Sequence, residues 1–205
     1  MSSSMNAGWQ VMLGSSNPHK RAELEALLAG WPVHLWTPKD FPGLEPPDET
    51  GTTFLENALL KARYYHSRTG LPTLSEDSGL EVEALEGEPG VRSARFAGQG
   101  ASDADNVARL LSLMKGKSNR RARFRTVMVY KDAGGEYVFE GALQGQIAAQ
   151  PAGTEGFGYD PVFVPEGWNS TLAQASQEAK NAVSHRACAL RRWIVFMQER
   201  EGWKK

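Results

Sequence analysis

The chain has 205 residues, of which 40% are hydrophobic and 23% are charged, as in an ordinary globular protein. Its 23 basic and 24 acidic residues give a net charge of −1, so it lacks the cationic excess by which proteins bind a nucleic acid polymer. The single cysteine, Cys188, excludes an internal disulfide framework and a cysteine-based metal cluster. No apolar run suits a signal peptide or a membrane span. We therefore expect one cytoplasmic domain over residues 1–205, with a flexible tail at 1–9.

The first half of the chain alternates strand and helix patterns. Short apolar runs predict strands, and small capping residues before an apolar periodicity predict helices. In chain order we expect a strand at 11–13, a helix at 18–28, a strand at 33–36, an irregular Pro-rich loop at 37–48 and a helix at 53–68. A strand at 71–74, an acidic turn at 75–79 and a strand at 80–85 follow. The second helix has an expected apolar stripe of Phe54, Leu55, Ala58, Leu59 and Ala62.

The second half predicts a Gly-rich loop at 87–100, a helix at 102–114, long strands at 122–131 and 136–149, a Gly-rich loop at 153–160 and a helix at 184–199. Bulges are expected in the second long strand at Gly141 and Gly145. The short turn at 133–135 predicts a β-hairpin. Helices mixed with a hairpin indicate an α/β fold whose sheet has mixed strand direction.

A small-residue loop joins the first predicted strand to the first predicted helix. Backbone N–H groups at a helix N-terminus, the helix dipole and a lysine together favour phosphate. An ordinary strand–helix turn has a similar composition, so both interpretations stay open. The residues concerned are Ser15, Ser16, Asn17, Pro18, His19 and Lys20.

Acidic residues suggest a cation site at a second place. Asp77 lies between Glu76 and Ser78, and Asp48 and Glu49 end the Pro-rich loop. Hard carboxylate oxygens suit Mg²⁺, which takes one or two protein carboxylates and leaves its other positions to water and phosphates. A solvated acidic turn explains the pattern equally well.

Two further clusters suit a nucleotide base. Phe157-Gly158-Tyr159-Asp160 could stack on a base and hydrogen-bond its edge, although two core aromatics at a turn would look the same. Lys180 and Ser184-His185-Arg186 could hold a phosphate or a base carbonyl, or could form a solvated helix start. Each cluster taken alone leaves both interpretations open.

The clusters belong to a longer series of motifs that runs from about Val11 to Leu190. In order, the motifs are Ser15-Ser16-Asn17-Pro18-His19-Lys20, Glu49-Thr50-Gly51, Phe54-x-Glu56-Asn57-Ala58-x-x-Lys61-Ala62, Asp77-Ser78-Gly79-Leu80, Pro89-Gly90-Val91-x-Ser93-Ala94-Arg95, Gly156-Phe157-Gly158-Tyr159-Asp160-Pro161-x-Phe163 and Lys180-Asn181-x-x-Ser184-His185-Arg186. In this order and spacing the chain resembles the inosine triphosphate pyrophosphatase family, in its bacterial branch of non-canonical purine nucleoside triphosphate pyrophosphatases.

The resemblance implies a mixed, elongated central β-sheet flanked by helices, with two lobes around a central cleft. It implies Mg²⁺-dependent hydrolysis of ITP, dITP, XTP and dXTP to a monophosphate and pyrophosphate by a homodimer. Asp77 matches the general base and metal ligand, and Asp48 a second metal ligand. Lys20 and the loop Ser15 to Lys20 match the triphosphate site. The remaining matches contact the substrate or its base: Ser78, Phe157, Gly158, Tyr159, Asp160, Lys180, His185 and Arg186.

The sequence departs from the family pattern in three places. Ser15-Ser16 stands where Thr-Gly is common, Asp48 stands where the bacterial branch usually has Glu, and Ala179 stands where an acid is frequent. The shorter arm of Asp48 leaves room for a water between carboxylate and metal. Rival hypotheses are a pyrophosphatase for pyrimidine or modified triphosphates and a non-catalytic nucleotide-binding module. Activity on a panel of substrates distinguishes the first rival. The acid at position 77 argues against the second, because a non-catalytic module would be expected to have lost it.

Overall fold

The computed structural model describes residues 8–205. Most of the tail expected at 1–9 lies outside this range, whereas Trp9 is already the first residue of β1. The helices are α1 (Pro18–Leu27), α2 (Phe54–Thr69), α3 (Asp103–Leu113), α4 (Gln177–Val183) and α5 (His185–Glu201). The strands are β1 (Trp9–Gly14), β2 (Val33–Trp36), β3 (Thr73–Val82), β4 (Arg121–Asp132), β5 (Gly135–Ile147) and β6 (Phe163–Pro165). In residues 8–205, no helix combines the length and apolar character that a membrane crossing requires.

The strands form a six-stranded sheet in the order β2-β1-β3-β4-β5-β6. Strand β1 pairs in parallel with β2 and with β3, whereas β5 and β6 are antiparallel. The predicted α/β fold with mixed strand direction is confirmed.

The chain divides into two compact units, each built from several segments. Unit 1 comprises Met1–Asp77, Val127–Phe139 and Ala189–Lys205, of which the structure describes the residues from 8 onward. Unit 2 comprises Ser78–Thr126 and Glu140–Cys188. Each unit has its own buried hydrophobic core.

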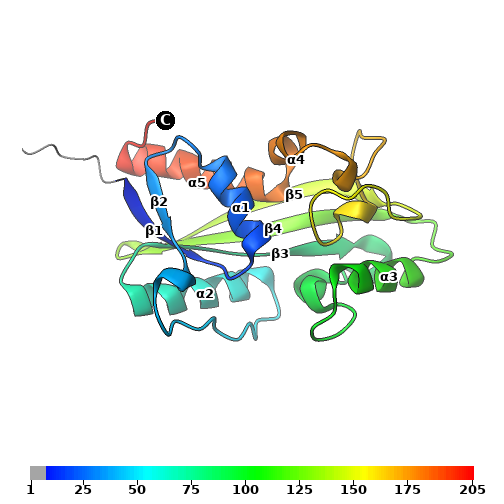
Figure 1. Cartoon of the computed structure of the whole chain (residues 1–205), viewed down its shortest axis with the longest axis horizontal. Coiled ribbons are helices and arrows are strands. Elements are labelled where there is room, and N and C mark those ends of the chain that lie inside the picture. The colour runs from blue at the N-terminus through cyan, green and yellow to red at the C-terminus, as the bar shows by residue number, and fades with distance from the viewer. Residues whose placement is uncertain (1–7) are drawn as a thin grey trace, which may run out of the picture. The chain divides into compact units, whose positions relative to one another are not determined.

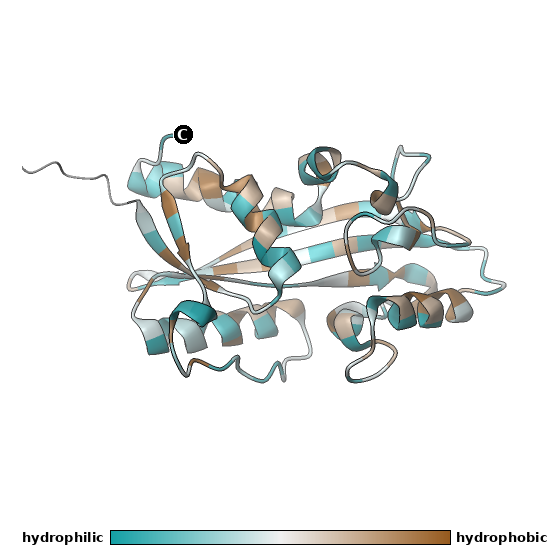
Figure 2. Ribbon diagram, in the orientation of Figure 1, coloured by the Kyte–Doolittle hydropathy of each residue, from teal (hydrophilic) through white to brown (hydrophobic). Residues whose placement is uncertain are grey.

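The core of unit 1 follows the alternation of strand residues. Val11 and Leu13 of β1 point into a cluster with Leu24 of α1 and Trp193 of α5, while α2 covers the opposite face of these strands (Figure 1). Hydrophilic and hydrophobic residues alternate along α1 and α2, as expected for helices with one buried face (Figure 2). The strands of unit 1 are therefore covered by helices on both faces.

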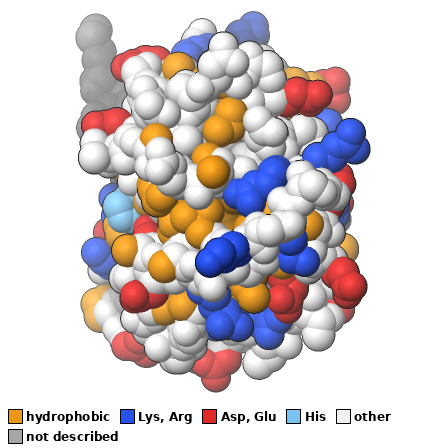
Figure 3. Space-filling view, turned by 90° about the vertical axis from the view of Figure 1, so that its right-hand side faces the viewer, with side chains coloured by type: hydrophobic (Ala, Val, Ile, Leu, Met, Phe, Trp, Pro, Cys, Tyr) orange, Lys and Arg blue, Asp and Glu red, His pale blue; other side chains and the backbone are white. Residues whose placement is uncertain are grey.

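In unit 2, α3 packs its apolar face on the strands. Val107, Leu110 and Met114 join Leu80 of β3 and Phe163 of β6 in one cluster. One face of the molecule, seen in Figure 3, carries hydrophobic side chains at its centre with Lys and Arg beside them and Asp and Glu towards the margin. Charges of both signs occur on this face, in keeping with the near-zero net charge.

The structure corrects the sequence prediction around the acidic cluster. Residues 75–79 form no turn, because β3 runs without a break from Thr73 to Val82. Ser75 pairs with Gly14 of β1, and Ser75, Glu76 and Asp77 are all buried. Parallel pairing with a buried neighbour outweighs the turn preference of Ser and Asp. The short elements α4 and β6 were not predicted, because seven and three residues are too few to show a period.

Candidate active site

The predicted site residues fall into two clusters, one in each unit. The Asp77 cluster comprises Ser15 to Lys20, Asp48 and Asp77, all in unit 1. The Lys180 cluster, in unit 2, comprises Ser78, Phe157, Gly158, Tyr159, Asp160, Lys180, His185 and Arg186.

The small-residue loop of the Asp77 cluster ends β1 and starts α1. Asn17 is the N-cap of α1, and its Oδ1 accepts hydrogen bonds from the N–H of His19 at 2.9 Å and of Lys20 at 3.2 Å. Pro18 follows in the first turn and carries no N–H. Two N–H groups that could meet a phosphate thus already have an acceptor. The loop's remaining attraction for an anion comes from the helix dipole, the hydroxyl groups and Lys20.

The start of the loop, at Gly14, lies very close to β3. A Cβ on Gly14 would come within 2.1 Å of Ser75 Oγ and 2.8 Å of a ring carbon of Tyr65. Glycine is therefore required at position 14 by space. The close approach places the beginning of the loop against the strand that carries Asp77.

Asp77 is a buried carboxylate among cations. It is 5% exposed, its Oδ2 accepts a hydrogen bond from Asn57 Nδ2 at 3.1 Å, and its Oδ1 lies 3.7 Å from Lys61 Nζ. Burial raises the pKa of the Asp77 carboxyl above its ordinary value. Lys61 and Lys20 act in the opposite direction, as does the Asn57 hydrogen bond, and the Glu49 charge adds to the rise.

The Pro-rich loop reaches this cluster through Glu49. Glu49 Oε1 accepts from Lys61 Nζ at 2.8 Å, so that Lys61 lies between two carboxylates. Asp48, the residue predicted from the sequence, and Glu49 are both exposed. The neighbouring Glu49 is thus the acid that the structure links to Asp77.

The Asp77 cluster fits a hydrated divalent cation. Within residues 8–205, no group of three or more His, Cys, Asp and Glu side chains is arranged to hold a metal. Mg²⁺ does not need such a cage, because it commonly keeps several waters and binds one or two carboxylates together with substrate phosphates. Asp77 supplies one hard carboxylate, and Asp48 and Glu49 are the candidates for a second.

The Lys180 cluster centres on a buried ion pair. Lys180 Nζ donates to Asp160 Oδ2 at 2.5 Å, and the same oxygen accepts from the N–H of Phe157 at 3.0 Å. The ammonium also lies 4.7 Å from the centre of the Phe157 ring, a cation–π distance. Asp160 therefore holds both the lysine and the backbone beside the partly exposed Phe157 ring.

Arg186 approaches the Phe157 ring as well, and the neighbouring His185 packs on another aromatic ring. Arg186 is 1% exposed, donates from Nη2 to Ser78 Oγ at 3.2 Å, and has its Cζ 5.9 Å from the Phe157 ring centre. The His185 ring stacks on Phe124 with centroids 4.9 Å apart and planes 11° from parallel. Both side chains are held firmly at the start of α5.

Tyr159 and Gly158 have structural partners. The Tyr159 ring belongs to the core of unit 2, and its hydroxyl donates to Ser93 O at 2.9 Å. Burial raises the pKa of this phenol. The N–H of Gly158 donates to Asp103 Oδ2 at 2.6 Å. Of the two aromatic residues in this motif, Phe157 is partly exposed and Tyr159 is buried.

Sequence reasoning assigned no role to Asn57 or Lys61. Leu55 of the expected stripe is 38% exposed, whereas the buried face of α2 contains both polar residues. The signal was present, because Asn57 and Lys61 share a helix face with Ala58 and Ala62. A polar pair within an apolar face is the pattern that would have identified them.

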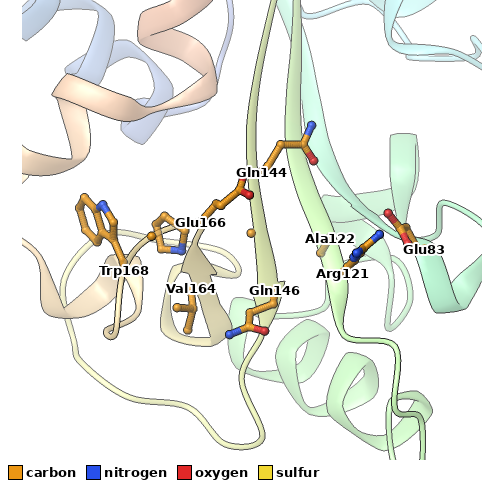
Figure 4. A pocket seen from close by; sticks show the side chains of 11 residues that line it. Glu83, Arg121, Ala122, Gln144, Gln146, Val164, Glu166 and Trp168 are labelled. Atoms are coloured by element: carbon orange, nitrogen blue, oxygen red, sulfur yellow. The ribbon is translucent and has the colours of Figure 1, made fainter.

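Unit 2 also has an open pocket of about 540 Å³ that none of the predicted residues lines. Figure 4 shows Gln144 and Gln146 of β5 between Trp168 on one side and Arg121 and Glu83 on the other. The pocket lacks a buried charge such as Asp77 or Lys180. Its lining shares no residue with the Lys180 cluster.

Comparison with known proteins identifies the family of the chain. The sequence profile of the Ham1 family matches residues 11–196, which include every candidate site residue. The chain belongs to the Ham1 family.

Curated relatives and solved structures of the Ham1 family match over nearly their whole length. A dITP/XTP pyrophosphatase of Geobacter sulfurreducens is 43% identical over 198 residues, covering 95% of this chain and 98% of the relative. The dITP/XTP pyrophosphatase of Yersinia pseudotuberculosis is 44% identical over 195 residues, covering 93% and 98%. A HAM1 protein from Coxiella burnetii superposes with a TM-score of 0.87 at 36% identity, covering 93% of this chain and 99% of the other. The family resemblance and the fold class inferred from the sequence are thereby confirmed.

Proposed function

We propose that the chain is a pyrophosphatase that hydrolyses dITP, ITP, XTP and dXTP to the nucleoside monophosphate and pyrophosphate. The observation that carries the proposal is the buried carboxylate of Asp77 beside two lysines in a chain that is 43% identical to a dITP/XTP pyrophosphatase. Such an enzyme would remove deaminated purines from the nucleotide pool.

The Asp77 cluster would bind the phosphate end of the substrate. A nucleoside triphosphate carries about four negative charges, which need cations and N–H donors around them. Lys20 supplies a charge beside the loop, and the dipole of α1 points its positive end the same way. Mg²⁺, held by Asp77 with Asp48 or Glu49, would neutralise part of the phosphate charge when bound.

Asp77 would act as the general base. Its carboxylate takes a proton from a water molecule as the water oxygen attacks the α-phosphorus. The bond from the α-phosphorus to the bridging oxygen breaks, and pyrophosphate leaves with the electron pair. A raised pKa brings a carboxylate nearer to the working pH and makes it a better proton acceptor.

The Lys180 cluster would recognise the base. The ring of Phe157 offers a surface on which a purine can stack. Arg186 and His185 carry N–H groups that suit the 6-keto oxygen of hypoxanthine or xanthine, whereas the 6-amino group of adenine would place donor against donor. Unpaired buried polar groups give discrimination on the order of 10⁴-fold.

Release of pyrophosphate from ITP, dITP, XTP, ATP and GTP, each with and without Mg²⁺, tests this function. We expect rapid, Mg²⁺-dependent turnover of ITP, dITP and XTP. Comparable turnover of ATP would contradict the base selectivity. Tight binding of ITP without turnover would favour the non-catalytic module instead, and preferred turnover of pyrimidine triphosphates would favour the other rival.

We also propose that the enzyme is a cytoplasmic homodimer, as the family resemblance implies. Light scattering of the purified chain measures its mass in solution directly. A mass equal to the 22.5 kDa of one chain at micromolar concentration would contradict the dimer.

A further inference from the structure

Asn57 is a fully buried polar residue to which the proposed mechanism gives no part. Its side chain is 0% exposed and belongs to α2, which supplies no predicted catalytic residue. Its amide has two partners: Oδ1 accepts from the N–H of Gly51 at 2.8 Å, and Nδ2 donates to Asp77 Oδ2 at 3.1 Å. One side chain thus links the Pro-rich loop to the proposed general base.

The chemistry of the two partners orients the amide. The N–H of Gly51 can only donate, and a carboxylate can only accept. Asn57 must therefore face Gly51 with its oxygen and Asp77 with its nitrogen. An aspartate at this position would keep the bond to Gly51 but would set one carboxylate against another.

The loop is packed tightly onto α2 at this point. A Cβ on Gly51 would lie 2.6 Å from Asn57 Oδ1 and 2.7 Å from Glu56 Cβ. Only glycine lets the backbone come so near. The N–H of Gly51 is consequently within reach of a short asparagine side chain.

A second side chain makes the same kind of link one helical turn further on. Lys61 Nζ lies 2.8 Å from Glu49 Oε1 and 3.7 Å from Asp77 Oδ1. Asn57 and Lys61 each contact the loop and Asp77. These two links, one helical turn apart on α2, fix the Asp77 carboxylate and the acidic end of the loop relative to each other.

We infer that Asn57 is a positioning residue for the reaction, which orients the Asp77 carboxylate and holds the loop segment 48–51 beside it. This inference rests on the proposed function, because it assigns Asp77 the role of the base. Asn57 is 0% exposed and offers no surface to a nucleotide, so its loss should act mainly on the chemical step.

Asn57→Ala and Asn57→Asp test the two bonds separately. We expect kcat for dITP to fall about 10- to 100-fold in both, because a small displacement of a catalytic group costs about 10²-fold. KM should stay within about threefold in both. Amide hydrogen exchange around Gly51 should accelerate in Asn57→Ala and stay near the wild-type rate in Asn57→Asp, which keeps the acceptor.

Asn106 of α3 offers a matched control. It is 2% exposed, its Oδ1 accepts from Ala97 N at 2.8 Å, and its Nδ2 donates to Ala94 O at 3.2 Å. Asn106→Ala removes two buried hydrogen bonds without touching Asp77. It should lower the unfolding midpoint about as much as Asn57→Ala does, with kcat within about threefold of wild type.

A double-mutant cycle separates positioning from a structural role. If Asn57 acts through Asp77, Asn57→Ala should cause less than about threefold further loss of kcat in an Asp77→Asn background. The inference would be overturned if the fold losses of kcat in the two single variants multiplied in the double variant. An unchanged kcat in Asn57→Ala would overturn it as well. Absence of dITP and XTP hydrolysis by the wild-type chain would instead overturn the proposed function, while the hydrogen-exchange comparison would still decide whether Asn57 holds the loop.

Discussion

The amino group of Lys180 lies 2.5 Å from Oδ2 of Asp160, and both side chains are about 95% buried. Removing one partner of a buried ion pair costs about 3–5 kcal/mol. We therefore expect Lys180→Met to lower the unfolding free energy by about that amount in a urea titration. KM for dITP should rise as well, because Asp160 then loses the cation that holds it beside Phe157.

The exposed pair Arg21–Glu25, 2.6 Å apart within α1, is the control for this prediction. Glu25→Gln should change the unfolding free energy by about 0.5 kcal/mol or less, as for other exposed i,i+4 pairs. Equal costs for the buried and the exposed substitutions would show that burial of the Lys180–Asp160 pair adds nothing to its contribution.

Asp77→Asn should separate activity from stability. Loss of the base is expected to lower kcat by about 10²- to 10⁴-fold. Burial raises the pKa of this carboxyl, so keeping Asp77 ionised near neutral pH opposes folding. We expect the thermal unfolding midpoint of the variant to equal or exceed that of wild type, as measured by calorimetry. A near-normal kcat would contradict the role of Asp77 as the base.

Glu136 predicts an acid-dependent loss of stability in unit 1. Hydrogen bonds from Arg63, helped by Lys131, lower the pKa of Glu136 from 4.5 to about 2. Its contribution is therefore complete above pH 4.5 and is lost as the pH falls towards 2. The pair is partly exposed, so Arg63→Ala should cost only about 1 kcal/mol near neutral pH. Urea titrations of the wild type and of Arg63→Ala should show their difference in unfolding free energy shrinking to zero as the pH falls through this range. A difference that stays constant with pH would contradict the contribution assigned to Glu136.

Trp203 joins the C-terminal residues to the core of unit 1. It is 3% exposed, and its ring centre lies 5.1 Å from that of Trp193 and 6.4 Å from those of Trp9 and Trp31. Trp203→Ala should lower the unfolding free energy by about 3–5 kcal/mol, as for other large-to-small core substitutions. Deleting residues 204–205 alone should have a much smaller effect. Similar losses from both changes, measured by urea unfolding, would contradict a special contribution of the indole.

Much of the fold could be predicted because local signals and tertiary packing agree. The helix caps at Asn17, Thr53 and Ser102 all lie where the sequence placed helix starts, and each side chain accepts from the first helical turn. The prediction was wrong at residues 75–79, where buried pairing with β1 decides the conformation. Pairing of this kind depends on residues far away in the chain, and no local pattern records it.

The difference between local patterns and long-range contacts also decides which residues of the candidate site could be predicted. Asp77 and Lys180 could be selected because charged residues in a motif suggest chemistry. Glu49 and Asn57 acquire their importance from distances of 2.8 Å to Lys61 and to Gly51, which only the folded chain defines. The stripe chosen for α2 was wrong at Leu55 because it assumed that the apolar residues of the helix are all buried.

The cap that Asn17 forms on α1 has a consequence for the energetics of an anion site. Its amide oxygen already accepts from the N–H groups of His19 and Lys20, so these two donors need no bound ion. With these two N–H groups occupied, side-chain charge, the loop hydroxyl groups and the helix dipole must supply most of the attraction for a triphosphate. Attraction of that kind is screened by salt, with a Debye length of about 8 Å at physiological ionic strength. KM should then climb with added potassium chloride while kcat stays level.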